Sequence, residues 1–109
     1  MAHSEELAER IREVILERAG FTEKKMFGGV AWMIQGNMAV ATFGDGLLVR
    51  VPRDEYEAAL AEPHVDPMNM GKRVMRGFVV VDAVGIEEED DLIEWIETGA
   101  SFASSLPPK

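Results

Sequence analysis

The side chains that could carry out catalysis do not form a known catalytic pattern in this sequence. The chain has no cysteine, and its two histidines are His3 and His64. None of the serines lies in a Gly-x-Ser-x-Gly motif, which would hold a serine nucleophile on a sharp turn. Neither histidine stands in a pattern that pairs a base with a nucleophile. The sequence therefore predicts a protein that is not an enzyme.

Side chains that could bind a metal ion are equally sparse. His64 has the carboxylates of Glu62 and Asp66 close to it in the sequence, without a second histidine or a thiolate nearby. Zinc sites in proteins use three or four such ligands, mostly histidine and cysteine. We predict neither a metal ion nor another cofactor.

Five consecutive acids, Glu87 to Asp91, form the densest group of ionisable side chains. A carboxylate that acts in acid–base catalysis needs surroundings that shift its pKa, such as burial. An acidic run before an apolar helical pattern is more typical of an exposed helix start, because negative charge there favours the helix dipole. We interpret the run in that way.

The Gly28-Gly29 pair could suggest a loop that cradles a phosphate group. Such loops lie between a strand and the N-terminus of a helix, whose N–H groups point at the anion. Here an apolar strand pattern follows the glycines, and no Gly-Lys-Ser/Thr sequence occurs. We interpret Met26, Phe27, Gly28 and Gly29 as a structural motif in which the glycines allow a bulge or a bend.

Methionines and basic residues are concentrated around residues 68–76. If the bases converge in space, they form a site for an anion or an acidic partner; if they are scattered, they neutralise nearby acids. Methionines in a loop either offer an adaptable contact surface or fill the core beneath the loop. Both alternatives stay open. The candidate interaction surface consists of Arg50, Met68, Met70, Lys72, Arg73 and Arg76.

The overall charge limits the classes of partner. The chain has 109 residues and a net charge of −9. Such a chain is repelled by nucleic acid phosphates and by anionic membrane surfaces. The middle of the chain is different, because residues 19–86 hold eight acids and seven bases. Any anion-binding face must therefore come from the middle.

Apolar periodicity predicts a helix at the start of the chain, followed by strands. Residues 5–18 place Leu7, Ile11 and Ile15 at helical spacing. Strand patterns follow at 25–35, 38–43 and 47–51, separated by the turn signals Gly36-Asn37 and Gly44-Asp45-Gly46. Turns this short join antiparallel strands. We expect Trp32, Met33 and Met38 on these strands to fill the core.

The second half predicts a short helix, less regular chain, a strand and a last helix. The helix covers residues 53–61, and the prolines at 63 and 67 bracket a loop. Residues 68–73 look irregular, 74–75 form a brief strand, and 77–82 form a strong strand. The last helix ends near Ser104. We predict one domain, residues 1–109, of the α+β class: a two-layer sandwich with an antiparallel sheet of about five strands and helices mainly on one face.

Several motifs in order resemble the amino-terminal domain of the TfoX/Sxy family of competence regulators. They are Lys25–Gly29, Gly36–Met38, Gly46–Arg50, Arg76–Val81 and the acidic helix with Trp95. The resemblance implies an antiparallel two-layer sandwich like that of secretion chaperones. It implies no catalytic residues. Founding members carry a second, helical domain, and this chain stops at Lys109.

The function that we predict is a non-enzymatic regulatory or adaptor module in the cytoplasm, which binds a protein partner or forms a homodimer. No apolar run is long enough to span a membrane, so no membrane association is expected. One alternative is a regulator linked to nucleic acid, although nucleic acid is an unlikely partner at this charge. Another is a small-ligand binder or enzyme with a pocket near Trp32 and residues 68–73.

Overall fold

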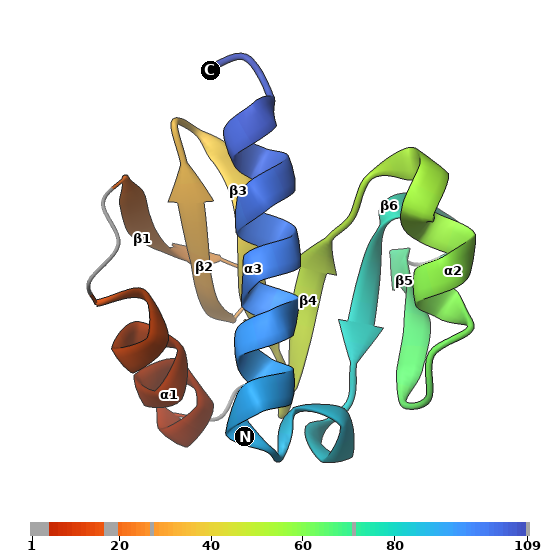
Figure 1. Ribbon diagram of the computed structural model, residues 1–109, viewed down its shortest axis with the longest axis horizontal. Coiled ribbons are helices and arrows are strands. Elements are labelled where there is room, and N and C mark those ends of the chain that lie inside the picture. Colours follow the sequence, from red (N-terminus) through yellow and green to blue (C-terminus); the bar gives the residue numbers. More distant parts are fainter. Residues whose placement is uncertain (1–4, 17–19, 27, 71, 109) are drawn as a thin grey trace.

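The computed structural model describes residues 5–16, 20–26, 28–70 and 72–108. Figure 1 shows three helices, with short 3-10 helices at Arg53–Glu55 and Ala83–Ile86, and six strands. The helices are α1 (Glu5–Ile15), α2 (Tyr56–Leu60) and α3 (Glu89–Ser105). The strands are β1 (Phe21–Met26), β2 (Gly29–Ile34), β3 (Asn37–Phe43), β4 (Gly46–Arg50), β5 (Val65–Met70) and β6 (Arg73–Val81). None of the helices in these described ranges is long and apolar enough to cross a membrane.

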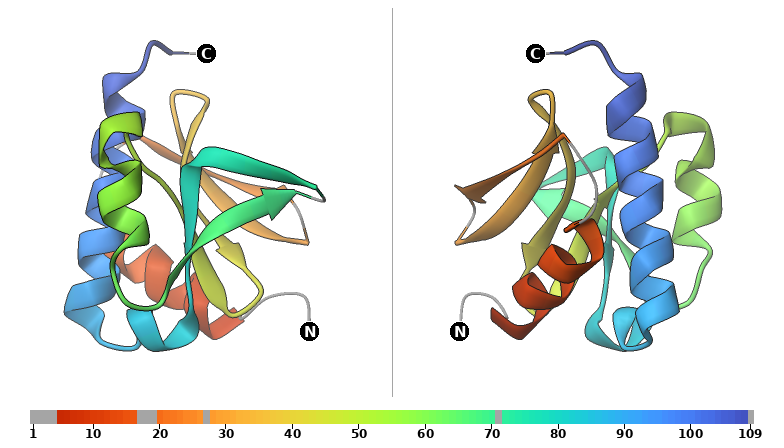
Figure 2. Two further views of the ribbon diagram at one scale, coloured as in Figure 1. Left: turned by 90° about the vertical axis from the view of Figure 1, so that its right-hand side faces the viewer. Right: turned by 60° about the vertical axis from the view of Figure 1, so that its left-hand side comes forward.

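All six strands form one antiparallel sheet, in the order β1-β2-β3-β4-β6-β5. The three helices lie together on one face of this sheet, and the ends of two hairpins project on the other side (Figure 2). The predicted α+β class and the antiparallel sheet with helices on one face are confirmed. The sheet has six strands where about five were predicted, because two corrections each add a strand and two predicted strands are joined in β6.

The first correction concerns Gly28 and Gly29, which do not bend a single strand at 25–35. Met26 pairs with Gly29, so this stretch holds two antiparallel strands, β1 and β2, and not one. Gly28 has a φ of +74°, a conformation that costs glycine little because it has no Cβ. Phe27 lies outside the described residues. A Phe-Gly pair is a weak turn signal, so the sequence pattern alone did not separate the two strands.

The second correction concerns Val65–Met70, which is strand β5 and not an irregular loop. Pro67 is compatible with this strand because β5 lies at the edge of the sheet, where one side of the backbone needs no partner. The register also shifts between Pro67 and Asn69. A proline makes any segment look less like a strand when the sequence is considered alone. The position of β5 at the edge of the sheet, which the sequence does not show, is what makes proline acceptable here.

Strand β6 is one long strand, where a brief strand at 74–75 and a separate strong strand at 77–82 were predicted. Its bend lies at Gly77, which has a φ of +94°. The Gly77 carbonyl accepts a hydrogen bond from the Val51 amide at 2.8 Å, so the bend is tied to the end of β4. Beyond it, the β5–β6 hairpin turns away from the helices (Figure 2, left). The bend thus directs this hairpin to the face that the helices leave open.

The main core lies between the sheet and the helices. Helix α1 contributes Leu7, Ala8, Ile11 and Ile15 from one stripe, as their spacing predicts. The predicted end of this helix at residue 18 is beyond its last described helical residue, Ile15, and residues 17 and 18 lie outside the described ranges. Helices α2 and α3 bury Tyr56, Leu92 and Ile96 against the same side of the sheet.

Helix α3 approaches strand β3 closely at Gly99. The register of β3 shifts so that Ala39 becomes an extra residue, and Ala39 packs with Ala100 and Ala103 of the helix. A Cβ on Gly99 would meet the Ala39 carbonyl oxygen and lie 2.9 Å from Cγ1 of Val40. Small residues on the helix therefore match the bulge on the strand.

We expect Gly99→Ala to lower the free energy of unfolding by about 1–2 kcal/mol, because the new methyl group overpacks the contact with the Ala39 carbonyl. Urea denaturation followed by circular dichroism measures this change. At a helix position with free space around it, replacing glycine by alanine raises the free energy of unfolding by about 1 kcal/mol. A variant more stable than the wild type would therefore contradict the close approach of Gly99 to β3. Ser101→Ala, at an exposed position of the same helix, is the control.

Candidate interaction surface

The sheet carries apolar side chains on both faces. Most antiparallel sheets with one helical layer alternate apolar and polar residues, whereas sheets covered on both faces have nearly continuous apolar runs. Here β2 reads VAWMI after its first glycine, and β6 reads FVVV at its end. Val30, Trp32, Val79 and Val81 face the helices, so the residues between them face the other way.

We call the surface turned away from the helices the methionine face. Four of its side chains are buried although no helix covers them, and five half-buried side chains pack against those four. Methionine predominates, and it repacks easily around different partners because its chain is unbranched. The methionine face consists of Ala31, Met33, Met38, Ala41, Leu48, Met68, Met75, Phe78 and Val80.

The structure corrects the predicted roles of two methionines. Met33 and Met38 were expected in the core, but they are half-buried on the methionine face. For Met68 both a contact surface and a filling role were left open; it is 3% exposed and packs in the apolar cluster of the methionine face, which favours the filling role. The predicted packing role of Trp32 is confirmed, because its side chain is 1% exposed within the main core.

Five of the six predicted surface residues lie on one hairpin. Met68 and Met70 are on β5, Lys72 is in the connection, and Arg73 and Arg76 are on β6. Arg73 pairs with Met70 and lies two residues before Met75, so it points to the methionine face. Arg76 follows Met75 directly and points to the other side of the hairpin. The side chain of Met70 lies outside the described residues.

Arg50, the sixth predicted residue, has a different environment. Its guanidinium carbon lies 5.4 Å from the ring centroid of Phe78 and 5.6 Å from that of Phe102. At these distances a cation is attracted to the face of an aromatic ring. Arg50 therefore bridges the end of β4 and helix α3, and it is half-buried rather than presented with the hairpin bases.

Lys24 joins the methionine face from the opposite edge of the sheet. It pairs with Ala31 across β1 and β2, and residues directly opposite each other share a face. Lys25 pairs with Val30 and faces the helix side instead. Lys24, Lys72, Arg73 and Arg76 are exposed, and in the described ranges no carboxylate forms an ion pair with any of them.

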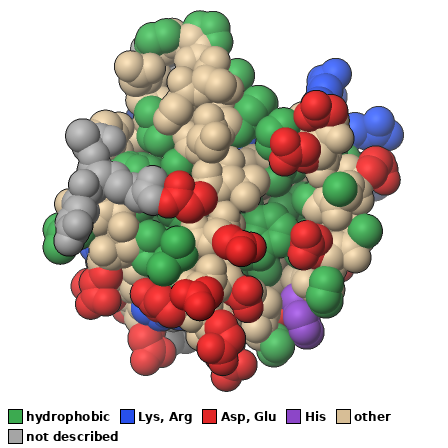
Figure 3. Space-filling view, viewed as in Figure 1, with side chains coloured by type: hydrophobic (Ala, Val, Ile, Leu, Met, Phe, Trp, Pro, Cys, Tyr) green, Lys and Arg blue, Asp and Glu red, His purple; other side chains and the backbone are tan. Residues whose placement is uncertain are grey.

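Charge is separated between the two layers of the molecule. Helix α3 and the residues before it carry Glu87–Asp91, Glu94 and Glu97, and among the charged side chains visible from the helix side in Figure 3 the acidic ones predominate. The six strands contain two acids and five bases. The acids are Glu23 and Asp66; the bases are Lys24, Lys25, Arg50, Arg73 and Arg76. The sheet layer is therefore positive in a chain whose net charge is −9.

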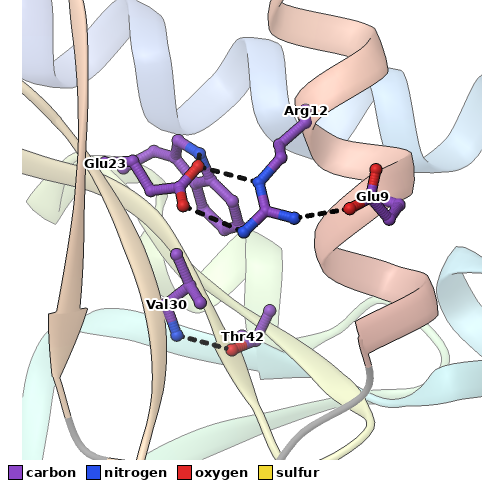
Figure 4. Close-up of polar contacts among 6 residues, drawn as sticks. Glu9, Arg12, Glu23, Val30 and Thr42 are labelled. Atoms are coloured by element: carbon purple, nitrogen blue, oxygen red, sulfur yellow. Dashed lines mark hydrogen bonds and ion pairs between the residues drawn. The ribbon is translucent and has the colours of Figure 1, made fainter.

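A polar cluster on the helix side joins α1 to β1 (Figure 4). The Arg12 guanidinium donates two hydrogen bonds to the Glu23 carboxylate, both at 2.9 Å, and one to Glu9 at 2.8 Å. The buried Trp32 indole N–H also donates to Glu23, at 3.2 Å. Strand β1 is thus fixed with Glu23 towards the helices. The sequence showed no signal for this cluster, because its members come from separate elements.

The hydrogen bonds from Arg12 hold the pKa of Glu23 below its ordinary value of 4.5. Their effect exceeds that of partial burial, which acts in the opposite direction. The same contacts raise the pKa of Arg12. Both side chains remain partly exposed to solvent, so this pair stabilises the fold by a modest amount, on the order of 1 kcal/mol or less.

A groove of about 220 Å³ lies between α2 and α3 on the helix side. Trp95 lines it together with the carboxylates of Glu55, Glu62, Asp91 and Glu94. Within the described part of the chain, no three His, Asp or Glu side chains are placed to hold a metal ion. His64 lies 3.4 Å from Asp82, not beside Glu62 or Asp66 as considered from the sequence.

The alternative prediction of a pocket near Trp32 and residues 68–73 is wrong. Trp32 packs in the main core on the helix side, whereas Met68 packs on the methionine face. The two side chains lie on opposite faces of the sheet and cannot line one site.

Fold and surface together define a small α+β domain whose sheet carries apolar side chains on both faces, with helices on one of them. Residues 15–103 match the family described as the TfoX N-terminal domain, so the chain belongs to this family. The resemblance stated from the motifs is confirmed. No curated protein and no solved structure matches the chain.

We expect Glu23→Gln to lower the free energy of unfolding by about 0.5–1 kcal/mol at pH 7, because it removes the charge that Arg12 contacts. The folded-state pKa of Glu23 is depressed, so its contribution is complete above 4.5 and is lost as the pH falls through the folded value. The gap in free energy of unfolding between the wild type and the variant should therefore disappear at acidic pH.

Urea denaturation at a series of pH values, followed by tryptophan fluorescence, measures this gap. Glu13→Gln, an exposed acid on α1, is the matched control. A gap that stays constant down to about pH 3 would show that the Glu23 charge contributes nothing to stability.

Proposed function

We propose that this protein is a non-enzymatic adaptor or regulatory module, which acts in the cytoplasm by binding another protein through the methionine face. Membership of the TfoX N-terminal domain family supports a role like that of competence regulators. The observation that carries the proposal is the uncovered apolar face of the sheet. A sheet face rich in Val, Phe and Met normally packs against a second layer.

The size and chemistry of the methionine face support a protein partner over a small ligand. Its residues come from five strands, β2 to β6, and so cover the breadth of the sheet. Four of its nine side chains are buried and five are half-buried, so the accessible part lies at Met33, Met38, Met75, Phe78 and Val80, where methionines can repack around a partner. A partner helix laid on this face would complete a three-layer sandwich, in which both faces of the sheet are covered.

The proposal predicts that a Met33→Gln, Met38→Gln double variant loses its partner but keeps its fold. Glutamine has nearly the shape of methionine, and these two side chains are only half-buried. The cost of burying their amides falls on the complex, because an amide without a hydrogen bond is unfavourable in an apolar contact. The measurement is affinity capture from the native host with tagged wild type and variant, followed by mass spectrometry.

Val84→Gln is the matched control, because Val84 is an apolar side chain that is 59% exposed and lies outside the methionine face. A stoichiometric protein retained by the wild type and the control, but lost by the double variant, supports the proposal. A partner that binds all three proteins equally contradicts it.

Nucleic acid is the second candidate partner, favoured by the unpaired bases Lys72, Arg73 and Arg76 on one hairpin. Capture with and without nuclease separates the two candidates. Loss of all binding after nuclease treatment would favour this candidate over the adaptor proposal, and such binding should weaken steeply with salt.

A further inference from the structure

We infer that the segment that docks on the methionine face is acidic as well as apolar, and that it comes from a different protein. The inference rests on the proposed function and specifies the chemistry of its partner. Lys24 at one edge of the face and Arg73 at the other are exposed and have no ion pair among the described residues.

The charges that face this surface come from three strands. Lys24 is on β1, Arg73 is on β6, and among the described residues of the strands the acid on this face is Asp66 on β5, which pairs with Val80. Arg50 lies at the rim, but the rings of Phe78 and Phe102 hold its guanidinium. Bases therefore stand on both sides of the apolar layer, and carboxylates spaced across a docking segment could meet both of them.

A second copy of this chain fits the face poorly in either arrangement. Two copies packed through their methionine faces would bring Lys24 and Arg73 of each against the same bases of the other, and like charges repel. The helix layer has the right charge, but among the described residues its exposed large apolar side chains are Leu16 and Val84. They do not form the apolar stripe that Met33, Met38 and Phe78 require.

The pairing register of the strands provides two matched pairs of basic residues for a test. Lys24 and Arg73 point to the methionine face, whereas their neighbours on the same strands, Lys25 and Arg76, point away from it. The double variants Lys24→Glu, Arg73→Glu and Lys25→Glu, Arg76→Glu have the same composition change and the same net charge. A difference in peptide binding between these two double variants therefore results from the charge on the methionine face and not from the overall charge of the protein.

The probe is a fluorescein-labelled peptide of about 18 residues, long enough to form a helix, with leucines along one stripe and glutamates elsewhere. Two further peptides replace every glutamate by glutamine or by lysine. Fluorescence anisotropy measures binding of each peptide to the full chain. We expect the glutamate peptide to bind most tightly, and to bind the variant with altered Lys24 and Arg73 about tenfold more weakly.

The variant with altered Lys25 and Arg76 should bind the glutamate peptide within about threefold of the wild type. A lysine peptide that binds as tightly as the glutamate peptide, or two double variants that weaken binding equally, would overturn the inference. So would a wild type that binds none of the peptides.

Methionine methyl spectra show where the peptide binds. With ¹³C-labelled methionine methyl groups, the resonances of Met33, Met38 and Met75 should shift on addition of the glutamate peptide. Shifts absent from these three residues would place the peptide elsewhere and contradict the inference.

Failure of this inference can be distinguished from failure of the proposed function. If the glutamate and glutamine peptides bind equally and the Met33→Gln, Met38→Gln variant loses both, the face docks a partner without requiring acid. If no peptide binds but that variant still loses its protein from the host extract, the proposed function stands and the inferred chemistry is wrong.

Discussion

A sheet that is apolar on both faces is the constraint on which the rest of this structure depends. The alternation of strand residues sends Trp32 and Val79 towards the helices and Met33 and Phe78 away from them. The helices cover one face with a packed core. On the other face, nine side chains partly shield one another, and the bend at Gly77 turns the β5–β6 hairpin towards them. One face therefore carries the main core, while the other carries a smaller apolar cluster that no helix covers.

Charge is distributed according to the same two layers. Acids cluster at the start of α3, where they favour the helix dipole and remain solvated. Bases lie on the strands and on the β5–β6 hairpin. The net charge of −9 describes neither layer, because it averages an acidic helix side and a basic sheet side. A partner that approaches the methionine face meets the local charge first, since screening limits the reach of more distant charges to about 10 Å.

The hydrogen-bonded cluster of Arg12, Glu23 and Trp32 links the two faces of the sheet to the distribution of charge. It holds Glu23 on the helix side of β1, and the alternation of the strand then places Lys24 on the methionine face and Lys25 back on the helix side. An ion pair that adds little to stability is thus consistent with the register that places Lys24, and not Lys25, on the methionine face. For the composition of this face, the position of the ion pair matters more than its contribution to stability.

The sequence by itself determined the class of the fold, the amphipathic α1, the strands joined by Gly36-Asn37 and Gly44-Asp45-Gly46, and the acidic start of α3, because spacing and turn chemistry are local properties. It also singled out Met68, Lys72 and Arg73 as surface candidates. Only the tertiary structure decided that β1 ends at Met26 and pairs with β2 from Gly29, that Val65–Met70 is a strand, and that Arg73 and Arg76 point to opposite sides. Strand pairing decides such questions, because a shift of one residue exchanges the faces. The bulge at Ala39 is likewise a feature of pairing, and here helix α3 packs against it.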